Sequence, residues 1–291
     1  MLFKNLLLTA FGASSAFGQV SFRRISERNA TIPGRFGCGT SEPSAEHINM
    51  SKMLAAQEVR AAYSGKPTTR ATINVGVYFH VVAQSQTVAG GYLTDDMLTK
   101  QLDVLNTDFA PHSIAFNLLG TDRTVNSGWS TDGNELAMKK ALRKGTYSDL
   151  NIYIQSKLSD DLYGYAYFPA SVSNGSDNYF LDGVIIDAQT VPGGSRANFN
   201  LGKTATHEVG HWMGLFHTFQ GGCTGTGDLV SDTPAQADAS SGCPTGRDSC
   251  PDQDGLDPIS NYMDYSDDAC YEEFSAGQVT RMHSSWNTYR N

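Results

Sequence analysis

Three histidines, a glutamate and a glycine lie within one short stretch near residue 210, at spacings that can bring imidazoles together. On a helix, His207 and His211 are one turn apart on the same face, so both rings can reach a single ion. A continuing helix would carry His217 about 9 Å past His211. Gly214 can end the helix in the left-handed conformation, which glycine adopts at little cost, and the chain can then return His217 to the ion. The pattern predicts one metal ion held by three imidazoles, a ligand set that suits zinc.

Glu208 is the residue that would make this metal site catalytic. Three imidazoles leave one position of a tetrahedral zinc for water, and the ion lowers the pKa of that water to about 7. Glu208 directly follows His207 and cannot share its metal position, but its carboxylate can take the proton of the water and pass it to a leaving amine. The alternative is a helix with incidental histidines, which the added glycine and third histidine disfavour.

The surrounding segments predict the scaffold that positions this stretch. Alternating apolar residues predict strands at 72–83, 114–118, 150–154 and 182–186, with an edge strand at 164–168. Helical spacing predicts helices at 47–62, after the cap Thr94, at 134–143, around the histidines, and after a capping box of Ser275 and Gln278. We expect Val209, Trp212, Met213 and Phe216 to seat the histidine helix against the sheet.

The amino-terminal end predicts secretion. Residues 1–18 combine Lys4, an apolar run at 6–16 and a small residue, Gly18, at a cleavage site, which is typical of a signal peptide. No segment approaches the length of about 20 apolar residues that spans a bilayer, so we expect no membrane partner. The polar stretch 19–70 is interpreted as a pro-segment. Residues 71–291 then form a catalytic domain with an upper lobe, 71–214, and a lower lobe, 215–291.

Charge limits the choice of partners. The chain has 291 residues and a formal net charge of −9, which disfavours nucleic acid and anionic membrane surfaces. We expect a monomer that acts on proteins or peptides. Oxygen-bearing residues in the run 227–233 predict a structural calcium ion, with a solvated acidic loop as the alternative; the candidate ligands are Asp228, Asp232 and Thr233. Surface sequons for glycosylation begin at Asn29, Asn49 and Asn174.

The cysteines are concentrated after the histidine stretch. Four of the five lie in a loop-rich region that needs crosslinks, and three pairings are open among Cys223, Cys243, Cys250 and Cys270. Cys38 stands alone. From the cysteine count alone, it is interpreted as a free thiol or a residue for an intermolecular bridge.

The segment after His217 resembles one family in particular. Residues 261–265 look like a Met-turn, and the runs 217–223, 232–234 and 261–270 resemble the pappalysin family of metzincins, specifically the small secreted extracellular metalloproteases of fungi and bacteria. The likeness covers roughly residue 72 to the carboxyl terminus. It implies an α+β metzincin zincin fold. A mixed twisted sheet and the active-site helix would form the N-terminal lobe, and an irregular disulfide-bonded C-terminal lobe would end in a helix.

This resemblance also implies roles for residues outside the histidine stretch. Met263 would lie beneath the zinc as an apolar floor, and the Tyr265 hydroxyl would stabilise the oxyanion, although a buried structural tyrosine is an alternative. The implied disulfides are Cys223–Cys250 and Cys243–Cys270. The surroundings of Cys38 are similar to the cysteine switch of zymogen metalloproteases, whose thiolate fills the open zinc position.

Taken together, these patterns predict a secreted zinc endopeptidase with substrate antiparallel to the edge strand. A zinc amidase for a non-peptide substrate and a catalytically silent secreted binding protein on the same fold are the alternatives; Glu208 disfavours the second. Relatives that prefer Lys or Arg just after the cut carry an acid immediately before the last cysteine. Ala269 stands there in this chain, so Asp267 or Asp268 would have to supply the charge.

Overall fold

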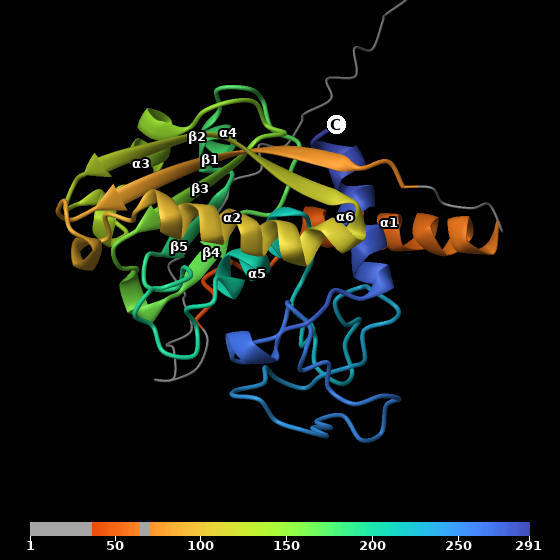
Figure 1. Ribbon diagram of the computed structural model, residues 1–291. Helices are drawn as coiled ribbons and strands as arrows, with labels where there is room; N and C mark the ends of the chain where they lie inside the picture. Colours follow the sequence, from red (N-terminus) through yellow and green to blue (C-terminus); the bar gives the residue numbers. More distant parts are fainter. Residues whose placement is uncertain (1–36, 65–69) are drawn as a thin grey trace, which may run out of the picture.

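A five-stranded mixed sheet forms the centre of the structure, a computed structural model that describes residues 37–64 and 70–291 (Figure 1). The strands are β1 (Ile73–Ala83), β2 (Ile114–Val125), β3 (Leu150–Gln155), β4 (Gly164–Ala166) and β5 (Val184–Asp187). Their order across the sheet is β2-β1-β3-β5-β4. All neighbours are parallel except β4, which runs antiparallel to β5 at the edge. This position of β4 confirms the predicted edge strand before Pro169.

Helices cover both faces of the sheet and extend beyond it. They are α1 (Ala45–Tyr63), α2 (Asp95–Phe109), α3 (Glu135–Leu142), α4 (Asp177–Leu181), α5 (Lys203–Trp212) and α6 (Ala276–Tyr289). Single 3-10 turns lie at Val88–Gly90, Ala110–His112, Trp129–Thr131, Ser159–Asp161 and Asp268–Cys270. Two predicted caps are confirmed, because Thr94 accepts from the Met97 amide and Ser275 forms the capping box with Gln278.

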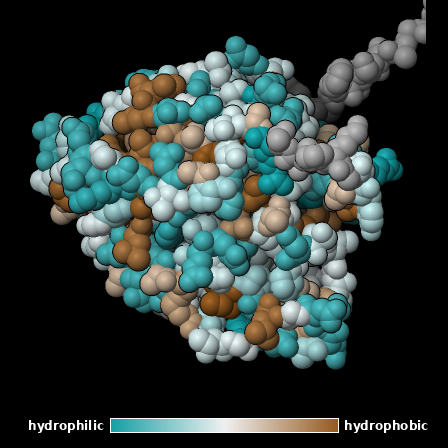
Figure 2. All heavy atoms as spheres, turned by 45° about the vertical axis from the view of Figure 1, so that its right-hand side comes forward, coloured by the Kyte–Doolittle hydropathy of each residue, from teal (hydrophilic) through white to brown (hydrophobic). Residues whose placement is uncertain are grey.

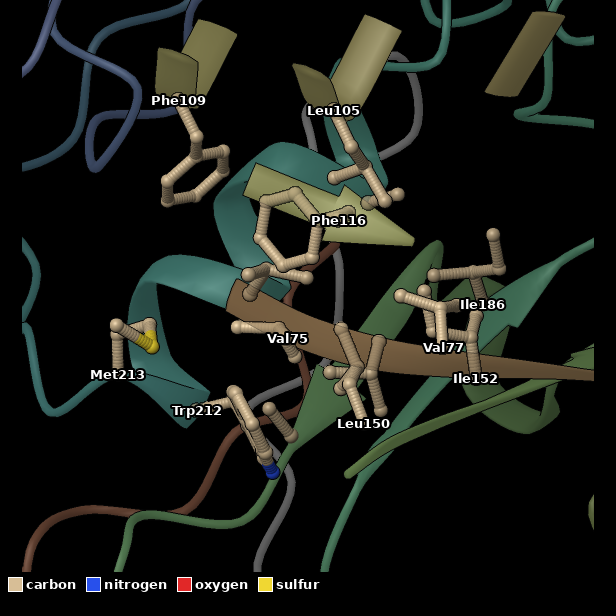
Figure 3. Packing of buried hydrophobic residues seen from close by; sticks show 14 of the residues in the cluster. Val75, Val77, Leu105, Phe109, Phe116, Leu150, Ile152, Ile186, Trp212 and Met213 are labelled. Atoms are coloured by element: carbon tan, nitrogen blue, oxygen red, sulfur yellow. The ribbon is translucent and has the colours of Figure 1, made fainter. Parts of the chain in front are cut away.

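The two faces of the sheet bury different side chains. Val75, Val77 and Phe79 alternate along β1 into the main core, where residues of α2 and α5 meet them. Figure 3 shows this cluster drawing on four strands as well as on both helices. The alternate residues of the strands point to the opposite face. There, Tyr153 of β3 and Ile185 of β5 pack with Met138 of α3. Burial on both faces fits the apolar run 184–186 of β5.

Three features of the fold differ from the prediction. Strand β2 continues to Val125, well past residue 118, and α4 forms in a segment that shows too little periodicity for a five-residue helix to be predicted. Phe216 is also misplaced in the prediction. It lies beyond the end of α5 and packs on the ring of Phe168 instead of joining the core cluster that contains Val209.

Residues 217–267 form an irregular lower segment that is held by crosslinks and polar contacts. Disulfides join Cys223 to Cys250 and Cys243 to Cys270, the two pairs that the resemblance implies. Between them, the Asp257 carboxylate accepts from the Ser249 amide at 3.0 Å and forms an ion pair with Arg247. Such contacts replace the hydrophobic packing that a segment of this composition cannot supply.

Helix α1 lies outside the sheet and packs on α6 (Figure 1). Its buried residues are His47, Ser51 and Leu54, which share one face at helical spacing. One turn further on, Glu58 pairs with Arg281 of α6 at 3.0 Å. The segment interpreted as a pro-segment therefore contains a docked helix.

The surface is mainly polar. Hydrophilic residues cover most of the face in Figure 2, with smaller apolar patches between them. Within residues 37–64 and 70–291, no helix has the length and apolar character needed to cross a membrane. The predicted signal peptide and Asn29 lie outside the described residues. The side chains of Asn49 and Asn174 are exposed, but Ser51, the third residue of the first sequon, is buried.

Candidate metal centre and active site

The three histidines converge on one point. His207 and His211 project from α5, which ends at Trp212, and Gly214 then adopts φ +97° as the chain turns. The three Nε2 atoms are 3.1 Å apart for His207 and His211, 3.3 Å for His207 and His217, and 3.0 Å for His211 and His217. Gly214 thus performs the turn that the sequence predicts.

The geometry of these imidazoles fits zinc. Zinc–nitrogen bonds of about 2.0–2.1 Å in a tetrahedron would separate two nitrogens by about 3.4 Å, close to the separations observed. Nδ1 of His207 lies 2.7 Å from the Tyr262 carbonyl oxygen, and Nδ1 of His211 lies 2.8 Å from that of Leu215. If each Nδ1–H donates to its carbonyl, both Nε2 lone pairs face the shared point. Burial also lowers the pKa of all three imidazoles, to about 4 for His211, which keeps them neutral as metal ligands require.

A cysteine completes the group. The metal-binding atoms of Cys38, His207, His211 and His217 all lie within 4.8 Å of one another. Cys38 Sγ is 3.6 Å from His211 Nε2, which is about the sulfur–nitrogen separation expected for two ligands of one tetrahedral zinc. In the described residues, this is the one cluster of at least three His, Cys, Asp or Glu side chains with such geometry.

Glu208 is buried beside the same point. Its Oε2 lies 3.6 Å from Cys38 Sγ and accepts a 2.9 Å hydrogen bond from the Thr40 hydroxyl. Burial raises its pKa to about 8, and the two hydrogen bonds oppose that rise. At Gly164, an added Cβ would come within 2.8 Å of Glu208 Cγ, so only glycine lets β4 pass this close to the carboxylate.

Residues 37–40 lie along β4 in the direction of the strand. Cys38 and Gly164 form a parallel bridge, the Gly39 amide donates to the Gly164 carbonyl at 2.8 Å, and the Ala166 amide donates to the Thr40 hydroxyl at 2.9 Å. Thr40 therefore links the edge strand to Glu208. Thr40 was not predicted, and its only sequence signal is a hydroxyl two residues after Cys38.

The segment after residue 260 supports the metal centre from the other side. Met263 is fully buried, and an added Cβ on Gly210 would lie 2.4 Å from its sulfur, so the glycine of the histidine stretch provides the space that Met263 fills. The Tyr265 hydroxyl lies 3.2 Å from His217 Nε2. Both residues thus contact the histidine stretch.

Asp108 is a second residue that was not predicted. It accepts hydrogen bonds from Lys203 and Thr206 at 2.6 Å each and from the Tyr262 hydroxyl at 3.0 Å. It thereby connects α2 to the start of α5 and to the residue whose carbonyl contacts His207. An acid beside Phe109, on the otherwise apolar face of α2, is the sequence signal for this role.

The remaining candidate residues have contacts of their own. Asp268 is buried and accepts from the Leu201 amide at 2.8 Å, just before α5, and burial raises its pKa to about 7; Asp267 is half-buried. Thr233 donates to Asp228 at 2.7 Å. Asp232 instead accepts from Ser275 and from the Gly277 amide at the start of α6. The three calcium candidates therefore do not all turn toward one point.

Comparisons with known proteins identify the family. The model of peptidase family M43, described as pregnancy-associated plasma protein-A, matches residues 138–287. The chain belongs to this family, the pappalysins. This pappalysin is 67% identical over 291 residues to an extracellular metalloprotease of Verticillium alfalfae, covering 100% of both chains. It is 59% identical over 290 residues to an extracellular metalloprotease of Neurospora crassa, covering 100% of this chain and 98% of that protein.

A solved structure shows the same fold. Mature mirolysin of Tannerella forsythia in complex with a cleaved peptide matches with a TM-score of 0.64 and 33% identity, covering 75% of this chain and 93% of that one. The predicted metzincin fold is therefore confirmed. With the family and its relatives, the fold identifies this pappalysin as a zinc metalloendopeptidase, and the extracellular relatives support secretion.

Proposed function

We propose that this pappalysin cleaves peptide bonds with a water molecule that Glu208 deprotonates. One observation carries the proposal: the Glu208 carboxylate and the three Nε2 atoms face one buried point, which Cys38 Sγ also reaches. A water at that point would lie within reach of both the metal ligands and the base.

The other steps of the proposed reaction are assigned to the following residues. Bound zinc, held by His207, His211 and His217, would acidify water and polarise the scissile carbonyl. Glu208 takes the proton of the water and returns it to the leaving amine. The Tyr265 hydroxyl, now beside His217, donates to the oxygen that gains negative charge. Strand β4 offers backbone groups at the sheet edge, and the mirolysin structure with its cleaved peptide supports peptide binding in this fold.

We further propose that residues 37–64 keep the enzyme latent. Cys38 would fill the fourth zinc position. The Thr40 hydroxyl donates to the Glu208 carboxylate oxygen that would otherwise accept from the water. The pro-segment lies parallel to β4, whereas the proposed substrate runs antiparallel to it. The peptide bonds of the pro-segment therefore do not take the position of a scissile bond. The mature mirolysin chain covers three quarters of this one, about the share made up by residues 71–291.

Two finer assignments belong to the same proposal. Asp268 is the stronger candidate for a preference for Lys or Arg just after the cut, because it is buried after the Met-turn whereas Asp267 is more exposed. Calcium binding, if it occurs at residues 227–233, would need Asp232 to leave its contacts with α6.

Casein cleavage by the purified chain tests the function. Activity should vanish with a zinc chelator and return with added zinc, and mass mapping should show internal cuts. The Cys38→Ala zymogen should be active without the lag of the wild type, and Cys38→Ser serves as the conservative comparison. Casein left intact by both the zinc-loaded wild type and Cys38→Ala would contradict the peptidase function; identical lags in wild type and Cys38→Ala would contradict only the switch.

A further inference from the structure

Three aromatic side chains enclose the imidazole of His47. They are Phe168, which follows β4, Phe216, which follows α5, and Tyr289 at the end of α6; together they are called the ring pocket here. The His47 ring stacks on Phe168 at 4.8 Å and 26° and on Tyr289 at 6.2 Å and 23°, with Phe216 tilted at 5.6 Å. His47 retains only 8% of its exposure. The ring pocket is thus a built site with an occupant of known shape.

The ring pocket adjoins the metal centre. The Phe168 ring lies edge-on to His211, with the ring centroids 5.5 Å apart. From Cys38 onward the pro-segment runs parallel to β4, in the direction of Phe168. A substrate antiparallel to β4 would pass the same strand in the opposite sense. Its residues before the scissile bond would therefore lie on the side of the ring pocket.

The flat ring of His47 fits the shape of the ring pocket, but its polar nitrogens do not suit the apolar surroundings. Its Nε2 is buried without a hydrogen-bond partner. Burial, and more weakly the charge of Arg281, lowers the pKa of His47 to about 4, while a hydrogen bond with the Pro169 backbone acts in the opposite direction. The site thus offers ring faces to the imidazole but leaves one of its two nitrogens, Nε2, without a hydrogen-bond partner. An uncharged aromatic ring would gain the same stacking without that desolvation penalty.

Removal of α1 would expose these rings. Phe168 and Tyr289 are half-buried with α1 docked. Phe216 is buried, and its ring contacts both His47 of α1 and Phe168. A cluster of exposed aromatic rings beside a catalytic cleft is the kind of surface that binds a ligand side chain.

We propose that, once α1 has left, the ring pocket is a substrate subsite for a Phe, Tyr or Trp side chain on the amino-terminal side of the scissile bond. The proposal rests on the peptidase function proposed above. In the zymogen, His47 occupies this subsite, and Cys38 and Thr40 block the metal centre.

Peptides built around one casein bond that the activated chain cuts would test the subsite. Phe or Leu is placed singly at each of the four positions before the bond, and kcat/KM is measured. We expect Phe to exceed Leu about three- to tenfold at one position, the range for an aromatic pair. Tyr289→Leu should lower the ratio of Phe to Leu cleavage at that position to about one, and Tyr289→Phe should keep the ratio of the wild type. Phe216→Leu provides a second variant from a different element.

The outcomes separate the two proposals. Equal cleavage of Phe and Leu peptides at all four positions, or a preference that survives both Tyr289→Leu and Phe216→Leu, would overturn the subsite and leave the peptidase function standing. Cleavage of no peptide by the zinc-loaded, activated chain would overturn the peptidase function, and the subsite with it.

Discussion

The metal centre is assembled from two regions that are stabilised in different ways. His207, Glu208 and His211 lie on α5, a helix whose other face is packed in the main core through Val209 and Trp212. By contrast, His217 and Tyr265 lie in irregular chain, where disulfides and hydrogen bonds to backbone groups replace helical packing. The helical region can hold two of the proposed ligands and the proposed base by hydrophobic burial, whereas the loop region depends on covalent crosslinks.

Specific polar contacts join the two regions. The Tyr262 carbonyl contacts His207, the Tyr262 hydroxyl contacts Asp108, and Asp268 accepts from Leu201 ahead of α5. We therefore expect damage to the loop region to release His217 from the metal without unfolding the sheet. Damage to the helical region should instead act on Glu208 and on the other two histidines together.

The largest expected effect is chemical and lies on the helix. Glu208→Gln keeps the shape of the side chain but removes the base, so turnover should fall at least about a hundredfold with zinc retained. Casein hydrolysis and zinc content by atomic emission measure the two quantities. Glu272→Gln, which neutralises an exposed acid, is the matched control. Full activity in Glu208→Gln would refute the assignment of the base.

Loss of a disulfide tests the loop region. Each disulfide joins cysteines 27 residues apart, so its removal should lower the free energy of unfolding by about 3.5 kcal/mol. Cys243→Ser with Cys270→Ser should also weaken zinc binding, because Cys270 anchors the segment whose Met263 carbonyl accepts from the Thr218 amide, next to the ligand His217. Helix content by circular dichroism should stay high. Cys223→Ser with Cys250→Ser is the comparison of equal loop length; retention of zinc by the Cys243/Cys270 variant at wild-type affinity would contradict the dependence on crosslinks.

The same contrast explains how much could be predicted from the sequence. Periodicity places β1, α2 and α5, and the glycine at 214 marks the turn, because these features follow from local backbone preferences and burial. Phe216 shares the helical spacing of the core residues, yet the turn at Gly214 moves it out of the helix, so its prediction is wrong. Thr40 and Asp108 act on residues far along the chain, at separations of 168 and 154 for Glu208 and Tyr262, and no local pattern encodes such contacts.

Acid should loosen α1, whose His47 contacts Phe168, after β4, and Phe216, which lies between the helical region and the loop region. The docked pKa of His47 is about 4 and its ordinary value is 6.5, so docking is at full strength above about pH 6.5 and weakens as pH falls toward 4, by up to about 3 kcal/mol. The charge of Arg281 adds to the shift, and Arg281 is paired with Glu58 on α1. Limited proteolysis of α1 measures the docking. His47→Phe should flatten the difference between pH 7 and pH 5, and equal pH profiles for the two proteins would contradict the burial of a neutral imidazole.

The smallest expected effect concerns Asp268, which joins the loop region to the start of α5. Asp268→Asn should weaken any preference for Lys or Arg just after the cut by about tenfold, through loss of a charge-assisted contact. Asp267→Asn, more exposed, should change it little. Peptide-library profiles give the ratio, and an unmodified enzyme that prefers large apolar residues at that position would exclude both carboxylates from specificity.

Zinc X-ray absorption of the secreted zymogen, before and after activation, tests the central claim most directly, since it reports the ligands from both regions and from the pro-segment at once. Before activation, we expect zinc to have three nitrogen ligands, from His207, His211 and His217, and one sulfur ligand, from Cys38. After activation, we expect three nitrogen ligands and one oxygen ligand. A zymogen whose zinc has no sulfur ligand would contradict the switch, and a zinc with fewer than three nitrogen ligands in both states would contradict the metal centre itself.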